Sequence, residues 1–320
     1  MASRKTFGNR WEVVEHVAEG GQSWVYEVRD LTGEWTDRAV LKRLKNHSRL
    51  ARFEREIKAT KALDHPSIAR VVDYSLADPA FYVSPYYEGT CLRSVAPLNT
   101  VAAINLFIAI CEAMVYAHSK GVIHRDIKPD NIIRKNDGSV VVVDFGLCYL
   151  QDEDRLTETM EQVGSRFYMA PEMEAGKAHL VTALADSYSL GKLLYFLLSG
   201  RDLHRESYSA ENDLVNVLSN KQLEYLNQFL FPVSVTADAS KRVPAAELME
   251  RALLVRRLVE EHFYPGREGS RCRLCGIGEY VRNARPTLRV KEGSLETNRT
   301  YETVVCNHCG NLQWFLPKSS

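Results

Sequence analysis

Cysteine is scarce in this chain, and charge of one sign does not predominate. Seven cysteines among 320 residues are too few and too oddly numbered for the disulfide scaffold of a small secreted protein. Lys and Arg number 41, as do Asp and Glu, so no overall basic field exists to collect nucleic acid or an anionic membrane. A hydrophobic share of 45% and a charged share of 26% exclude a disordered or collagen-like chain.

Long hydrophobic runs are also lacking. Residues 1–10 are polar and have no apolar core of the kind found in a signal peptide. The most apolar stretch, residues 101–117, is interrupted by Asn105 and Glu112. A membrane-spanning helix needs about 20 predominantly apolar residues. We therefore expect a buried core helix here, no membrane partner and a cytoplasmic location.

The residue pattern changes twice along the chain, and the length suggests about two domains. The first hundred residues are rich in β-forming runs and contain one amphipathic helix, whereas the following part is mainly helical. Residues 263–271 are rich in Gly, Pro and charge and indicate a linker. The expected strands cover 11–17, 24–28, 38–44, 69–74, 81–87 and 140–145, and the expected helices cover 48–63, 100–121 (with Thr100 as N-cap and Gly121 as the stop), 190–198 and 245–261.

Three short motifs follow one another in the helical part. They are His124-Arg125-Asp126-Ile127-Lys128-Pro129-Asp130-Asn131, then Asp144-Phe145-Gly146, then Ala170-Pro171-Glu172. With these motifs, residues 11–260 resemble the eukaryotic-type Ser/Thr protein kinase family. The resemblance implies an α+β, two-lobed kinase-like fold over residues 11–262, with an N-lobe at 11–84 and a C-lobe at 90–262.

The resemblance also implies roles for the polar residues of the first two motifs. Phosphoryl transfer requires that phosphate charge be neutralised and that the acceptor hydroxyl be aimed in line. Asp126 would orient the hydroxyl and accept its proton, and Lys128 would neutralise the γ-phosphate. Asn131 and Asp144 would hold Mg²⁺, which prefers hard oxygen ligands.

An ion pair is expected in the N-terminal part. Lys42, in Ala39-Val40-Leu41-Lys42, matches the lysine that holds the α- and β-phosphates of ATP in the family. Glu56 lies three residues after Phe53, so the two share a face of the expected helix. Glu56 is therefore the candidate partner of Lys42.

The expected nucleotide pocket departs from the family pattern in its phosphate loop. Of the three glycines in the family's loop only the middle one is kept, with Gly21 added beside it, and glycines allow a close backbone approach to phosphate. Ser84 falls at the gatekeeper position, and Ile133 is the candidate beneath the base. The residues assigned to the pocket are Ala18, Gly20, Gly21, Ser23, Val25, Ala39, Lys42, Pro85, Tyr87 and Ile133.

Other residues support an intact kinase lobe. By resemblance, Asp186 steadies the catalytic loop and Glu172 pairs with Arg242. Ser165 and Lys128 favour Ser/Thr over Tyr acceptors.

A second constellation lies near the C-terminus. Cys272-Arg273-Leu274-Cys275-Gly276 and Cys306-Asn307-His308-Cys309-Gly310 are two CxxC pairs, each followed by glycine. Four thiolates suit tetrahedral, structural Zn²⁺, and the module, residues 272–316, resembles a zinc ribbon. A redox CxxC pair is the chemical alternative, against which the absence of a thioredoxin-like βαβ context argues.

The expected ribbon is locally basic. Residues 270–320 contain eight Lys and Arg, four Glu and no Asp, together with four aromatic residues. Such a face could bind nucleic acid. The alternative is an ordinary zinc-stapled domain or a protein-docking module.

We therefore expect an enzyme that transfers the γ-phosphoryl group of ATP to Ser or Thr hydroxyls of a protein substrate, with Mg²⁺ and a structural Zn²⁺. The alternatives are a pseudokinase-type nucleotide-binding scaffold, a kinase for a small molecule, and a ribbon that binds nucleic acid or protein under control of the kinase domain. The sequence indicates neither the substrate nor the oligomeric state.

Regulation is expected at the activation segment. In the family an Arg before the catalytic Asp, here Arg125, commonly binds a phosphate on that segment. The corresponding position is Glu161, which is already negative, so we hypothesise that it pairs with Arg125 without phosphorylation. The alternative is phosphorylation at Thr157 or Thr159.

Overall fold

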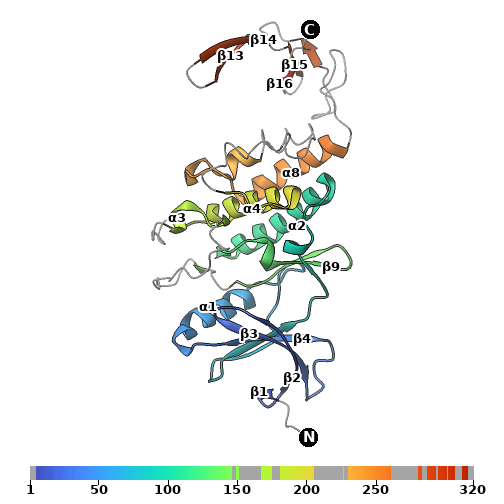
Figure 1. The fold of residues 1–320 in the computed structure, drawn as a ribbon, viewed down its shortest axis with the longest axis vertical. Helices are drawn as coiled ribbons and strands as arrows, with labels where there is room; N and C mark the ends of the chain where they lie inside the picture. Colours follow the sequence, from blue (N-terminus) through green and yellow to red (C-terminus); the bar gives the residue numbers. More distant parts are fainter. Residues whose placement is uncertain are drawn as a thin grey trace. The chain divides into compact units, whose positions relative to one another are not determined.

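The computed structural model describes residues 5–145, 149–150, 167–174, 181–204, 226, 230–260, 280–282, 287–292, 295–300, 302–306 and 312–315. The chain divides into two compact units, Met1–Arg257 and Leu258–Ser320. Within the first unit, Figure 1 shows a β-sheet with one helix, followed by a layered group of helices. This arrangement agrees with the expected α+β organisation.

The first unit begins with a six-stranded antiparallel sheet in the order β1-β2-β3-β4-β6-β5. Its strands are β1 (Thr6–Phe7), β2 (Trp11–Glu19), β3 (Ser23–Asp30), β4 (Ala39–Leu44), β5 (Asp73–Ser75) and β6 (Phe81–Pro85). Five of them overlap the expected runs, with β2 and β3 longer than predicted and β5 starting at Asp73 rather than at residue 69. Strand β1 was not predicted.

Helix α1 (Leu50–Lys61) packs on one face of this sheet. It starts after a 3-10 turn at His47–Arg49, so the helix predicted from residue 48 is two residues shorter at its start. Phe53 and Ile57 are buried with Leu44 of β4 and Ala80. Glu56 lies on the same buried face of α1 and is 5% exposed. The helical spacing of Phe53, Glu56 and Ile57 therefore brings a carboxylate to the sheet.

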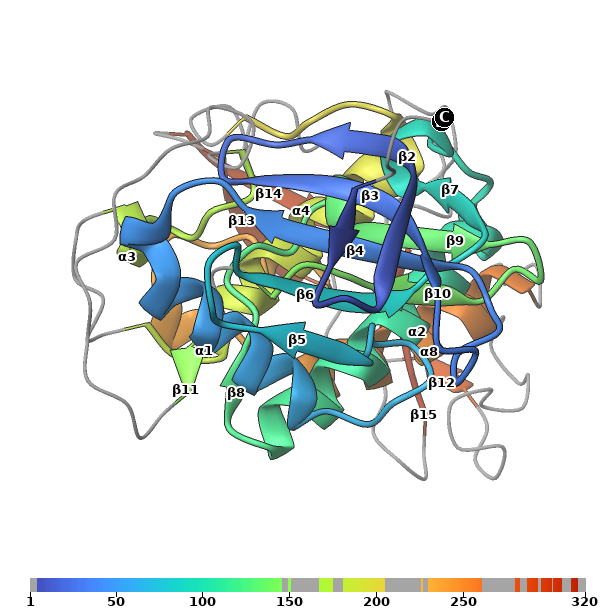
Figure 2. The same ribbon diagram turned by 90° about the horizontal axis from the view of Figure 1, so that it is seen from below.

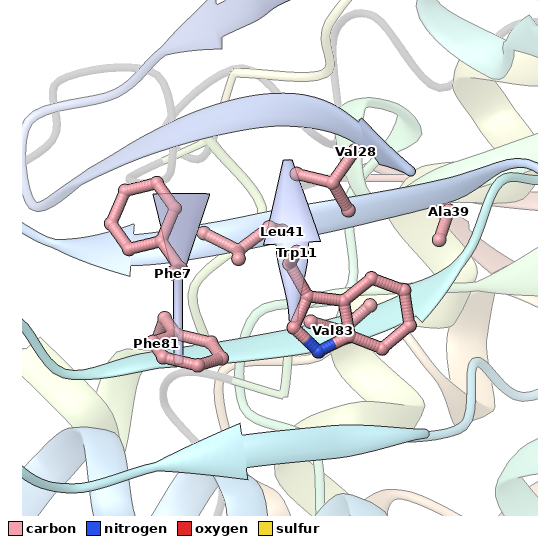
Figure 3. Close-up of a cluster of buried hydrophobic side chains, with 7 residues drawn as sticks. All are labelled: Phe7, Trp11, Val28, Ala39, Leu41, Phe81 and Val83. Carbon is pink, nitrogen blue, oxygen red and sulfur yellow. The ribbon is translucent and has the colours of Figure 1, made fainter. Parts of the chain in front are cut away.

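The other face of the sheet has its own hydrophobic cluster, drawn in Figure 3. Phe7 of β1 and Trp11 of β2 pack over side chains of the central strands. The Trp11 indole also donates to Asp73 Oδ2 at 2.6 Å, which links β2 to the edge strand β5. The cluster members are Phe7, Trp11, Val28, Ala39, Leu41, Phe81 and Val83.

The rest of the first unit is mainly helical, with short strands between the sheet and the helices (Figure 2). One small sheet has the order β10-β9-β7, and β11 pairs with β8. The strands are β7 (Gly89–Cys91), β8 (Val122–Ile123), β9 (Ile132–Lys135), β10 (Val140–Val142) and β11 (Tyr149–Leu150). The α-helices are α2 (Thr100–Ser119), α3 (Pro171–Glu174), α4 (Leu184–Ser199) and α8 (Ala245–Glu260). The 3-10 turns are η2 (Leu92–Ser94), η3 (Pro129–Asn131), η7 (Phe231–Val233) and η8 (Ala239–Lys241).

Helix α2 covers the most apolar stretch of the sequence. By length and composition alone it could cross a membrane, but half of its apolar window is buried inside the unit, where it packs on α4 and β10. The expectation of a core helix agrees with this packing. Its N-cap is Asn99 rather than Thr100, because the Asn99 side chain accepts from the Ala102 N–H at 2.9 Å. Gly121, with φ of 73°, follows its end as predicted.

Helix α4 is buried along almost its entire length, as predicted for residues 190–198. It also carries buried polar residues, among them Asp186, Ser189 and Lys192. Because buried polar groups are unfavourable without partners, these side chains indicate internal hydrogen bonds. Their partners lie in the candidate site described below.

The described residues of the second unit form two small antiparallel sheets. Strands β12 (Tyr280–Arg282), β15 (Glu302–Cys306) and β16 (Leu312–Phe315) form the order β12-β15-β16. Strands β13 (Thr287–Glu292) and β14 (Leu295–Thr300) form a hairpin. Cys306 ends β15 opposite Tyr280. Cys272, Cys275 and Cys309 lie outside the described residues.

Candidate active site

Lys42, Glu56 and Asp144 meet between the large sheet and the segment after β10. The Lys42 ammonium lies 2.7 Å from Glu56 Oε1 and 2.8 Å from Asp144 Oδ1. Strand β4 supplies the lysine, α1 supplies the glutamate, and Asp144 follows Val142 at the end of β10. The structure therefore brings together three residues that the sequence predicted from separate motifs.

The three groups perturb one another electrostatically. Burial opposes the charge of Lys42, but the carboxylates of Asp144 and Glu56 raise its pKa well above the ordinary value. Burial also opposes ionisation of Asp144, yet the Lys42 ammonium holds its pKa well below the ordinary value. Burial, assisted by the charge of Asp144, raises the pKa of Glu56 despite the contact with Lys42. The ammonium is thus retained as a fixed positive charge.

Asp126 is held by two neighbours from the same loop. Lys128 Nζ lies 2.7 Å from Asp126 Oδ2. Asn131 donates its side-chain amide to the same oxygen at 2.9 Å and to the Asp126 carbonyl at 2.8 Å. Both donors act on one carboxylate oxygen, so the carboxylate orientation is fixed. Three residues that the first motif singled out, Asp126, Lys128 and Asn131, are thus held together by direct contacts.

Asp186 of α4 fastens the start of this loop. Its side chain accepts from the His124 N–H at 2.9 Å and from the Arg125 N–H at 2.8 Å. Arg125 has φ of 65°, a left-handed conformation that costs about 1–3 kcal/mol for a residue other than glycine. Asp186 therefore steadies the loop, as predicted, by holding the strained residue Arg125 that precedes Asp126.

Asp186 has a third partner in His118 of α2, whose Nε2 lies 2.8 Å from Oδ2. Burial opposes the charge of Asp186, but the hydrogen bonds from His118 and from the loop hold its pKa below the ordinary value. The aspartate is therefore ionised at neutral pH.

The segment Phe167–Glu174 is tied to the helical part at several points. Arg242, which is buried, forms a bidentate pair with Glu172 at 2.6 and 2.9 Å, as predicted. Ser189 donates to the Tyr168 carbonyl at 2.8 Å, and Lys192 donates to the Phe167 carbonyl. Gly146, Thr157, Thr159, Glu161 and Ser165 lie outside the described residues.

The expected phosphate loop connects β2 and β3. Ala18 lies opposite Val25 in the strand pair, and the Gly20 N–H donates to the Ser23 carbonyl at 3.0 Å across the turn. Lys45 donates to the Gly20 carbonyl and to Glu19 Oε1, both at 2.6 Å. These bonds tie the turn, which includes Gly21, to the end of β4, and no sequence pattern predicted them.

The expected adenine-binding residues lie at the junction of the two parts of the unit. Ala39 is opposite Pro85, and Ser84 is buried before it. The Tyr87 hydroxyl accepts from the Arg70 N–H at 3.1 Å. Ile133 lies on β9, opposite Cys91 of β7. Ala39, Ser84, Pro85 and Ile133 thus lie on strands, whereas Tyr87 lies in the connection between β6 and β7.

Tyr82 is a site residue that sequence reasoning missed. It lies directly opposite Lys42 in the β4–β6 pair, and its hydroxyl donates to Glu56 Oε1 at 2.9 Å. The alternation of Phe81–Pro85 offered a signal, since residues two apart in a strand face the same side. The pairing register needed to place Tyr82 beside Lys42 was not available from the sequence.

The arrangement suits phosphoryl transfer. A fixed carboxylate at Asp126 can accept a hydroxyl proton, and two lysines can neutralise phosphate. Asn131 directs its amide nitrogen to Asp126, so its remaining acceptor is the amide oxygen. Together with the Asp144 carboxylate this is a donor set of hard oxygens that fits Mg²⁺.

The chain matches the sequence model of one protein family and is similar in sequence to many curated proteins. The model of the protein kinase domain matches residues 11–256. "Serine/threonine-protein kinase PrkC" of Bacillus subtilis is 32% identical over 212 residues, which are 63% of this chain and 32% of the relative. "Probable serine/threonine-protein kinase PknB" of Lactococcus lactis is 34% identical over 208 residues, 62% of this chain and 32% of the relative.

"Serine/threonine-protein kinase PknB" of Mycobacterium leprae is 33% identical over 215 residues, 62% of this chain and 34% of the relative. The matched segment is thus about a third of the length of these curated relatives.

Proposed function

Because the chain belongs to the protein kinase family, we propose that it transfers the γ-phosphoryl group of ATP to Ser or Thr hydroxyls of a protein substrate. The observation that carries this proposal is the joint geometry of its two charged clusters. Lys42 contacts both Glu56 and Asp144, and Asp126 is held by Lys128 and Asn131.

Each charged residue has a role in this reaction. Lys42 would bind the α- and β-phosphates while Glu56 keeps the ammonium in position. Asp126 would orient the acceptor hydroxyl and take its proton, and Lys128 would neutralise charge on the transferred group. Mg²⁺, when held by Asn131 and Asp144, would supply further charge neutralisation at the phosphates.

The choice of acceptor rests on two supports. The similar curated proteins are named as serine/threonine-protein kinases. In this chain Lys128 lies two residues after Asp126 and contacts it, as expected of an enzyme that acts on Ser or Thr. A pseudokinase scaffold is disfavoured because the predicted catalytic residues are all present and form the two charged clusters described above.

For the second unit we propose a zinc ribbon that docks partners or regulates the kinase. The supports are the two CxxC-Gly pairs and the β-strand that leads into the second pair. Four thiolates would close a structural Zn²⁺ site. Binding of nucleic acid through the basic residues of this unit is the alternative role.

The test of the main proposal is incubation of the full chain with labelled ATP, Mg²⁺ and a generic protein acceptor, followed by phosphosite mapping. We expect label on Ser or Thr. Asp126→Asn should lower the transfer rate by about 10²–10⁴-fold, because a positioned acid–base group is lost. Asp137→Asn, in an exposed turn, is the matched control. Absence of transfer by the wild type, or transfer to tyrosine only, would refute the proposal.

A further inference from the structure

Tyr82 contacts α1 in two ways at once. Its ring packs against Phe53 with centroids 5.5 Å apart, and its hydroxyl donates to Glu56 Oε1 at 2.9 Å. Phe53 and Glu56 are one turn apart on the helix. Because β6 lies inside the sheet between β4 and β5, the side chain that makes these contacts is anchored on a well-supported strand.

We propose that Tyr82 is a positioning residue, which holds Glu56 of α1 against the sheet so that Lys42 stays in place for phosphoryl transfer. This inference rests on the proposed kinase function and deepens it. Tyr82 acts through Glu56 and does not itself touch the reacting groups.

The need for such a residue follows from the demands on Lys42. In the structure its ammonium, with three donors, already serves both Glu56 and Asp144. Nucleotide binding would add phosphate oxygens to these acceptors. Glu56 is a buried carboxylate, and a buried charge is unfavourable unless it is hydrogen-bonded. Tyr82 supplies Glu56 with a donor that does not have to serve phosphate as well.

The hydroxyl is suited to act as a permanent donor. Burial, together with the charge of Glu56, raises the pKa of Tyr82 well above its ordinary value, so the phenol keeps its proton at all working pH values. Both Tyr82 and Lys42 donate to the same oxygen, Oε1 of Glu56. Since Tyr82 is on β6 and Lys42 on β4, the helix is linked to two adjacent strands through one atom.

The test is Tyr82→Phe in the full chain, which removes the hydroxyl and keeps the ring on Phe53. Hydrogen bonds to a charged group are among the stronger ones, so we expect kcat/KM for ATP to fall about tenfold. The change should lie mainly in KM for ATP, with KM for the protein acceptor unchanged. A residue that is only structural would instead lower the active fraction, leave KM for ATP unaltered and lower the melting temperature.

Tyr74→Phe is the matched control. Tyr74 lies opposite Tyr82 on β5, is 41% exposed, and undergoes the same chemical change. We expect wild-type kinetics from Tyr74→Phe. If Tyr82→Phe and Tyr74→Phe both behave as the wild type, the inference is wrong while the kinase function stands. If the wild type itself transfers no phosphoryl group, the proposed function fails first.

A double-variant experiment tests whether Tyr82 acts through Glu56. In a Glu56→Gln background the acceptor is neutral, and charge-assisted hydrogen bonds are about twice as strong as neutral ones. The further loss caused by Tyr82→Phe should then shrink from about tenfold to about threefold or less. An undiminished loss in that background would overturn the proposal, because Tyr82 would act through another group.

Discussion

Replacing Asp186 with Asn should weaken both the fold and the catalytic loop. The carboxylate accepts from the backbone N–H groups of His124 and Arg125 through different oxygens, and from His118 through Oδ2. The Asn side chain keeps one acceptor oxygen, but its NH₂ group faces whichever donors contacted the other carboxylate oxygen and cannot accept from them. At least one charge-assisted bond is lost in a buried place, so the free energy of unfolding should fall by about 2–4 kcal/mol.

The assay is thermal unfolding of the full chain together with initial rates of phosphoryl transfer. For a unit of roughly 150–250 residues the loss corresponds to about 4–16 °C in melting temperature. The rate at 25 °C should fall by more than the folded fraction does, because Arg125 is no longer held in its left-handed conformation beside Asp126. Asp64→Asn, on the exposed side of the same unit, is the control.

The pH dependence gives a second check. The pKa of Asp186 is lowered in the folded chain, so its stabilising effect is full above the ordinary aspartate pKa of about 3.9 and is lost as pH falls through the folded value. The difference in melting temperature between wild type and Asp186→Asn should be constant from about pH 6 to 8 and shrink only below about pH 4. Equal melting temperatures and equal rates at pH 7 would refute the reasoning.

Three further predictions follow from other features. Glu172→Ala leaves the buried Arg242 without its bidentate partner, and unfolding free energy should fall by about 3–5 kcal/mol in the same thermal assay; an unchanged melting temperature would contradict this. Elemental analysis should find one Zn²⁺ per chain, lost in Cys306→Ser, whereas zinc-free wild type that resists proteolysis throughout would exclude the site. If Glu161 replaces an activating phosphate, phosphatase treatment should leave activity intact and Glu161→Ala should lose much of it; the reverse result would place control at Thr157 or Thr159.

The residues of the candidate site could be singled out because they lie in short motifs whose residue types and order resemble those of the family. Asp126, Asn131 and Asp144 lie in short motifs. In the structure Asp126 contacts Lys128 and Asn131, and Asp144 contacts Lys42. The pairing of Lys42 with Glu56 was predictable too, since helical spacing placed Glu56 beside the buried Phe53. These predictions depended on local patterns and on the resemblance of the motifs to those of the family.

Features that depend on tertiary pairing were not predictable. The contact of Tyr82 with Glu56 requires the register of β4 and β6, which no local pattern specifies. Strand β1 has two residues, too few for an alternation to be visible. The N-cap of α2 was placed one residue late, because Asn99 and Thr100 both carry a side-chain oxygen and only the geometry shows which one accepts.

The hydrophobic core of the large sheet extends further toward the N-terminus than the match to the family model does. The family model begins at Trp11, but Trp11 shares its cluster with Phe7, which precedes it. A polypeptide started at residue 11 would lose Phe7 and leave the rings of Phe81 and Tyr26, which contact it, facing water. Loss of a buried phenylalanine costs about 1.5–3 kcal/mol. The smallest piece that folds as well as the whole unit therefore begins upstream of residue 11, where the match to the family model starts, and a truncation at that boundary would yield a less stable protein.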